Sequence, residues 1–248
     1  MKDNSTPNQL KLPTLAAGLA GLLLRQVLYV TGTDSKGLLP DFHWAGILLW
    51  ILTLAVGILL VLRTKALPRE TSGDIAPGAG CLMLGAAVLI SAFTGAPDKS
   101  SLLAAISRVL GIAAGVALAA WGISRFLHRQ PWWLLPVIVC VFFTFRTVLK
   151  YRLWSSHPQL QDYFFYLGAH VCLMLASYYH GAAAAEMGTP RLLWIFSLGA
   201  VFFCCVAIPR SADPLFLLAC GVWAFCNLSC PDSKPRRQMP PLHLEDSP

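Results

Sequence analysis

Ionisable side chains within long apolar stretches are the first candidates for chemistry in this sequence. Three are arginines, Arg25, Arg108 and Arg146, and two are histidines, His170 and His180. An ionisable group inside a lipid bilayer is costly unless it is paired, reaches the interface or faces water. These five residues therefore indicate either structural contacts between helices or a polar binding site.

Two of the arginines share a sequence spacing. Arg25 is followed after sixteen residues by Asp41, and Arg146 is followed after sixteen residues by Asp162, with a new apolar run opening at each aspartate. Each arginine would meet the aspartate of its own helical hairpin at the membrane interface, which predicts two structural ion pairs. The alternatives are arginines that reach the interface alone, or pairs that line a vestibule and attract anions.

His170 lies deepest in its apolar stretch, about 10 Å from the outer end at 1.5 Å per residue. Tyr166 precedes it by one helical turn and Ser177 follows it by two, so the three form a polar stripe on one helix face. Arg108 has no matching residue in the second half of the chain. We predict a solute-binding site formed by His170, Arg108, Tyr166 and Ser177. The alternative is a histidine that only bonds a neighbouring carbonyl.

Other familiar chemistry lacks its residues. The eight cysteines include no Cys-x-x-Cys pair, and the chain has no His-Glu-x-x-His or Gly-x-Ser-x-Gly motif. His180 lies about 80° around the helix from His170, which does not suit a two-histidine metal site. Small residues at 78–80 and 111–115 predict close helix contacts and not a phosphate loop. We predict no catalytic residue, metal or cofactor; an intramembrane enzyme that uses a histidine is the weaker alternative.

The elements that must position these residues are apolar helices. The chain is 56% hydrophobic and 12% charged, which is far from the composition of soluble domains. About 20 helical residues cross the hydrocarbon core of a bilayer. We predict an all-α polytopic membrane protein with eight transmembrane helices, at 12–30, 44–62, 76–93, 102–123, 132–149, 163–185, 192–208 and 213–228, the eighth being the shortest and least secure.

Further matches extend the shared arginine–aspartate spacing into an internal repeat. The tripeptides Leu-Gly-Ala and Leu-Leu-Ala occur in the same order in both halves, at 84–86 and 102–104 and again at 198–200 and 217–219. Matches in register indicate a duplicated unit. We predict two tandem four-helix repeats, residues 12–125 and 132–228, which have the same orientation because each contains an even number of spans.

Basic residues orient the predicted bundle. Eleven lysines and arginines fall in loops and tails on one side of an eight-span arrangement, and five fall on the other. The positive-inside rule then places both termini in the cytoplasm, with the protein in the plasma membrane. Residues 1–11 would form a cytoplasmic tail, and residues 229–248 a disordered cytoplasmic tail rich in proline, serine and charge. Loop cations facing anionic lipid account for the formal charge of +7 without a nucleic-acid partner.

The architecture suggests a function by analogy. Parallel repeats related by an axis along the membrane normal occur in transporters, whose sites lie between the repeats. We therefore predict a small-molecule permease or the substrate-binding subunit of a transporter, with the lipid bilayer and a small anionic or polar solute as partners. The alternative is a non-catalytic membrane module for assembly or sensing, which works through a membrane or cytoplasmic protein partner.

Overall fold

The computed structural model describes residues 8–32, 43–64, 75–94, 102–127, 129, 131–154, 160–185, 187, 189–209 and 211–228. The backbone of these residues forms eight α-helices and no strand, which confirms the predicted all-α class. Each helix overlaps the predicted span of the same rank. The helices are α1 (Asn8–Gly32), α2 (Trp44–Arg63), α3 (Ile75–Thr94), α4 (Leu102–Phe126), α5 (Leu134–Trp154), α6 (Leu160–Ala184), α7 (Pro190–Ala207) and α8 (Pro214–Asn227).

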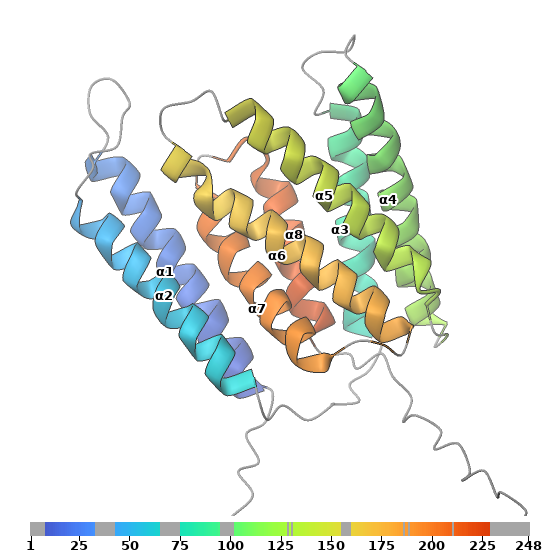
Figure 1. The fold of residues 1–248 in the computed structure, drawn as a ribbon, viewed down its shortest axis with the longest axis horizontal. Helices are drawn as coiled ribbons and strands as arrows, with labels where there is room; N and C mark the ends of the chain where they lie inside the picture. Colours follow the sequence, from blue (N-terminus) through green and yellow to red (C-terminus); the bar gives the residue numbers. More distant parts are fainter. Residues whose placement is uncertain are drawn as a thin grey trace, which may run out of the picture.

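Six of the helices form a closed ring. Around it, α3 packs on α4, α4 on α5, α5 on α6, α6 on α7, α7 on α8, and α8 on α3 again. Helices α1 and α2 form a separate hairpin that docks on the outside of the ring, mainly through α1 against α7 (Figure 1). Helix α1 begins and α8 ends at the same end of the bundle.

Six helices, α1 to α5 and α7, have the length and composition of membrane spans. Their outward faces carry many exposed apolar side chains, which lipid covers at no hydrophobic cost. The protein is therefore an integral membrane protein in contact with lipid. The described residues form eight helices, of which six meet these criteria, so the predicted count of eight transmembrane spans stays a prediction.

The other two helices depart from that pattern for different reasons. Helix α8 has 14 residues, so at 1.5 Å per residue it is about 21 Å long and shorter than the hydrocarbon core. Helix α6 has 25 residues but carries the polar side chains of His170, Ser177 and His180, all of which are buried in the bundle. These three polar residues therefore face protein and not lipid.

Glycines allow α3 and α4 to cross closely. A Cβ atom at Gly122 would lie 2.9 Å from the carbonyl oxygen of Gly78, and one at Gly85 would lie 3.2 Å from that of Gly115. The glycines are seven residues apart on each helix, so the two pairs stack along one antiparallel seam. The predicted role of Gly78 and Gly115 in helix contacts is confirmed.

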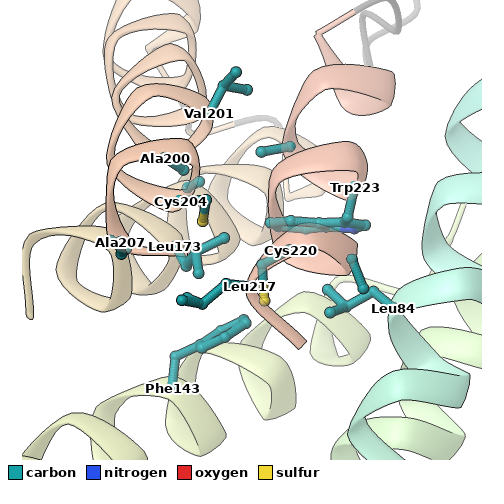
Figure 2. Packing of buried hydrophobic residues seen from close by; sticks show 14 of the residues in the cluster. Leu84, Phe143, Leu173, Ala200, Val201, Cys204, Ala207, Leu217, Cys220 and Trp223 are labelled. Carbon is teal, nitrogen blue, oxygen red and sulfur yellow. The ribbon is translucent and has the colours of Figure 1, made fainter. Parts of the chain in front are cut away.

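The middle of the ring is filled with apolar side chains (Figure 2). They come from α3, α5, α6, α7 and α8 and include Leu84, Phe143, Leu173, Cys204 and Leu217, each of which is fully or almost fully buried. Along α6, Leu173 lies between His170 and the pair Ser177 and His180. The two buried histidines of α6 therefore lie on opposite sides of Leu173 along the helix.

The division into repeats at 12–125 and 132–228 stays a prediction. The ring combines α3 and α4 of the first predicted unit with all four helices of the second, and α6 packs extensively on α7. Helix α2, the predicted counterpart of α6, makes no comparable contact with α3 within the described residues. The predicted tail at 229–248 lies outside those residues, and α1 begins at Asn8, within the predicted N-terminal tail.

Candidate functional site

Arg146 is the centre of a polar cluster at one end of the ring. It extends from α5 across the ring interior to Asp213, the residue before α8, and its Nη2 lies 2.8 Å from Oδ2 of that carboxylate. Its Nη1 donates to Ser91 Oγ on α3 at 3.4 Å. The side chains of Arg146 and Asp213 are 14% and 32% exposed. This cation therefore links three ring helices while keeping some access from the end of the bundle.

Aromatic rings pack against this ion pair. The guanidinium carbon of Arg146 lies 3.9 Å from the centroid of the Phe216 ring, a distance at which a cation is attracted by the ring face. The His170 ring stacks against Phe216 at 6.1 Å and against Tyr166 at 4.3 Å. Phe143 contacts His170 edge-on at 6.2 Å. Arg146 and His170 thus rest against the same aromatic side chain.

His170 has no solvent exposure. Its Nδ1 lies 3.0 Å from the backbone oxygen of Tyr166, one turn earlier on α6. A hydrogen bond from His170 to a neighbouring carbonyl was the alternative to solute binding that the sequence left open. It occupies one ring nitrogen, and Nε2 has no hydrogen-bond partner among the described residues.

The four residues of the predicted solute site do not come together as one group. Tyr166 lies beside His170, and the ammonium of Lys150 is 5.8 Å from the Tyr166 ring centroid. Ser177 is buried two turns further along α6, where its hydroxyl donates to the backbone oxygen of Leu173 at 2.8 Å. Arg108 is half-buried on α4, and no hydrogen bond joins it to the other three in the described part of the chain. Their joint role in binding stays a prediction.

Both predicted ion pairs also stay predictions. Asp41 and the side chain of Asp162 lie outside the described residues. The observed carboxylate partner of Arg146 is Asp213, 67 residues away on another helix. Asp213 is at the start of the last predicted span, so the sequence predicted that it lies near the membrane interface. The sequence did not predict that it pairs with Arg146.

Arg25 joins the hairpin to the ring through neutral acceptors. Its Nη1 donates to the backbone oxygen of Val206 on α7 at 2.9 Å. Its Nε and Nη2 donate to the hydroxyl of Tyr29 at 3.1 and 2.9 Å. The guanidinium carbon lies 5.2 Å from the centroid of the Phe165 ring on α6. These contacts attach α1 to two helices of the ring.

A second cluster occupies the opposite end of the ring. His180 on α6 contacts Trp121 on α4 at 5.3 Å and Trp223 on α8 at 5.8 Å, and the two indoles are 6.0 Å apart. Asn227 donates to the backbone oxygen of Trp223 at 2.9 Å, and Arg125 is buried one turn beyond Trp121. Of these residues, only His180 was identified as a candidate from the sequence. A tryptophan in an apolar run gives no indication of which side chains it contacts in the folded protein.

The arrangement suits the binding of an anion better than metal chemistry. Within the described residues, no group of three His, Cys, Asp or Glu side chains is placed to hold a metal ion. The first cluster contains the cations Arg146 and Lys150 and the single described carboxylate Asp213. Its described side chains therefore carry one net positive charge beside a partly exposed guanidinium.

Comparison of the chain with protein-family models, with curated proteins and with solved structures found no match. The fold itself defines the class of protein, which is an integral membrane protein made of apolar helices around a partly polar interior.

Proposed function

We propose that this membrane protein binds a small anionic or polar solute at the Arg146 cluster and acts as a permease or as the substrate-binding subunit of a transporter. The observation that carries the proposal is the Arg146–Asp213 pair, which crosses the ring interior at 2.8 Å between two partly exposed side chains. A guanidinium presents several donors in a planar fork and binds carboxylate or phosphate through two parallel hydrogen bonds.

Binding would occur by exchange of one carboxylate for another. An incoming anion would take over donors of Arg146 that now point to Asp213 and Ser91. Lys150, one turn beyond Arg146 on α5, would add a second positive charge near the entrance. Because α3, α5 and α8 all contribute to the pair and its neighbours, occupation of the site would alter contacts between ring helices, as transport requires.

The proposal includes an orientation. The Arg146 cluster lies where α5 ends and α8 begins, and the excess of loop cations is at the opposite end of the eight-helix arrangement. In the plasma membrane this would put the cluster on the outer side and both termini in the cytoplasm. Single cysteines introduced at Lys2 and Arg237 of a cysteine-free protein should react with membrane-impermeant thiol reagents only after the cells are opened. Labelling of both positions in intact cells would indicate the reverse orientation, and labelling of one position would indicate a different number of spans.

The binding proposal is tested by the thermal unfolding of the detergent-purified protein in sodium acetate, lactate, phosphate or sulfate, against chloride at equal ionic strength. A ligand that binds only the folded state stabilises it by about 2.7 kcal/mol at one hundred times its Kd. We expect at least one of the four anions to raise the midpoint. Arg146→Gln should abolish this response, and Asp213→Asn should strengthen it because the competing carboxylate is gone.

Arg25→Gln is the matched control, since Arg25 is equally a buried membrane arginine but lies against neutral acceptors. It should keep the response of the unmodified protein to the anions. The proposal is wrong if none of the four anions has an effect, or if Arg146→Gln responds as the unmodified protein does. Uptake of the stabilising anion into proteoliposomes then separates a permease from a binding subunit.

The second candidate function, a membrane module that works through a partner protein, is favoured by the surface of α2. This helix packs mainly on α1, and it exposes ten large hydrophobic side chains, among them Leu54 and Ile58. A photoreactive amino acid at Leu54 or Ile58 should label a discrete protein in native membranes if a partner covers this face. Labelling of lipid alone would remove this candidate.

A further inference from the structure

The tautomer of His170 is fixed by its only described hydrogen bond. The backbone oxygen of Tyr166 can only accept, so Nδ1 at 3.0 Å must carry the proton. In a neutral imidazole the other nitrogen, Nε2, is then an acceptor with a lone pair. The charged group that shares the Phe216 ring with His170 is the cation Arg146, and Asp213 is already paired with Arg146, so no described carboxylate is left to stabilise a protonated ring.

Two buried nitrogen atoms of the cluster have no hydrogen-bond partner among the described residues. One is Nε2 of His170, an acceptor, and the other is Nε of Arg146, a donor. Both side chains rest against the Phe216 ring. Buried polar atoms are normally hydrogen-bonded, so an unpaired donor and acceptor in one cluster indicate a molecule that offers one acceptor and one donor.

We infer that the solute of this site is a small hydroxy-carboxylate, whose carboxylate oxygens accept from Arg146 and whose hydroxyl donates to Nε2 of His170. This inference rests on the proposed function and names its substrate class. A carboxylate without a hydroxyl leaves Nε2 unpaired. An amino acid supplies a donor, but its ammonium group is repelled by the net positive charge of the described cluster.

The test compares lactate with propionate, which has the same carbon chain without the hydroxyl, and with alanine, which carries an ammonium in its place. Binding to the purified protein is measured by isothermal titration calorimetry and by the midpoint of thermal unfolding. We expect lactate to bind at least about tenfold more tightly than propionate, because only lactate pairs the buried acceptor. Alanine should bind more weakly than lactate.

His170→Phe removes the acceptor while keeping an aromatic ring that stacks on Tyr166 and Phe216. It should lower lactate affinity to the level of propionate. His180→Phe, the same substitution at the other buried histidine of α6, is the control and should keep the preference for lactate. If His170→Phe does not fold, the comparison of lactate with propionate on the unmodified protein decides the question without it.

The outcomes separate this inference from the proposed function. Equal affinities for lactate and propionate overturn the inference, because Nε2 is then satisfied by water alone, and they leave anion binding at Arg146 intact. Binding of phosphate or sulfate without either carboxylate also overturns the inference only. The absence of any anion effect overturns the proposed function and the inference together.

Discussion

Arg25 and Arg146 occupy equivalent positions in the sequence pattern, yet their guanidinium groups have different surroundings. Arg25 is 5% exposed and donates to a backbone carbonyl and a tyrosine hydroxyl. Arg146 is more exposed and faces the carboxylate of Asp213. The shared spacing predicts a similar depth in the membrane for the two cations. The helix that packs beside it decides whether the cation is a structural anchor or a charged site.

The acceptor of Arg25 explains its structural character. Val206 is the penultimate residue of α7, and the last four carbonyls of a helix have no partner within that helix. These carbonyls also carry the partial negative charge of the helix dipole, which favours a nearby cation. Arg25 therefore caps α7 from a different helix. Its contact with the ring needs no carboxylate.

The largest expected effect is the loss of this cap. Arg25→Met leaves the Val206 carbonyl and the Tyr29 hydroxyl without their donor in a buried place, which should cost about 2–4 kcal/mol of unfolding free energy. Reversible unfolding of the purified protein in detergent measures it. Gln26→Met is the control, since it makes the same new side chain at the exposed neighbouring position. Equal stability of the two variants would contradict the capping role.

A smaller effect is expected for the Arg146–Asp213 pair. Its partners are partly exposed, so the loss of either one should cost about 1–3 kcal/mol, below the value for a fully buried pair. In a double-mutant cycle of Arg146→Met and Asp213→Leu, we expect a coupling of about 1–2 kcal/mol. If the losses of unfolding free energy in the two single variants simply add in the double variant, the 2.8 Å contact orients the two side chains without stabilising the fold.

Salt should distinguish the two arginines further. Raising the ionic strength from 0.1 to 1 M shortens the screening length from about 10 to 3 Å. The destabilisation caused by Asp213→Asn should shrink in high salt, because the pair that it removes is partly accessible to ions. The destabilisation caused by Arg25→Met should change less with salt, because the described acceptors of Arg25 are neutral. A salt-dependent loss at Arg25 would indicate a charged partner.

The smallest expected effects test the two ion pairs predicted from spacing. Asp41→Asn and Asp162→Asn should each cost no more than about 1 kcal/mol, as is usual for pairs at an interface. Each cost should vanish when the arginine sixteen residues earlier is already replaced by methionine. A loss at Asp41 as large as that of Arg25→Met would make Asp41, and not the Val206 carbonyl, the main partner of Arg25.

The helices were predictable because an apolar run is a strong local signal. The predicted span at 76–93 becomes α3 (Ile75–Thr94), and that at 213–228 becomes α8 (Pro214–Asn227). The pairing of Arg146 was not predictable in the same way. Sequence distance favoured Asp162 in the same hairpin, but ring closure brings Asp213 from α8 to within 2.8 Å of Arg146.

The candidate site was predictable in part for the same reason. His170 and Tyr166 share a turn of one helix, so their proximity follows from helix geometry alone. Ser91 and Asp213 belong to other helices, and only the order of helices around the ring brings them to Arg146. Trp121 and Trp223 meet His180 by the same long-range packing. Neither hydrophobicity nor spacing records such contacts.

The closed ring also has a consequence for biosynthesis. Helix α8 is the last ring helix to be made, and it supplies both the contact with α3 and the residue that pairs with Arg146. Until α8 leaves the ribosome, α6 and its two buried histidines lack one wall of protein and face lipid or the insertion machinery. A nascent chain stalled before Asp213 would therefore display unpaired polar groups within the membrane. Such groups would make it a preferred substrate for membrane quality-control proteases.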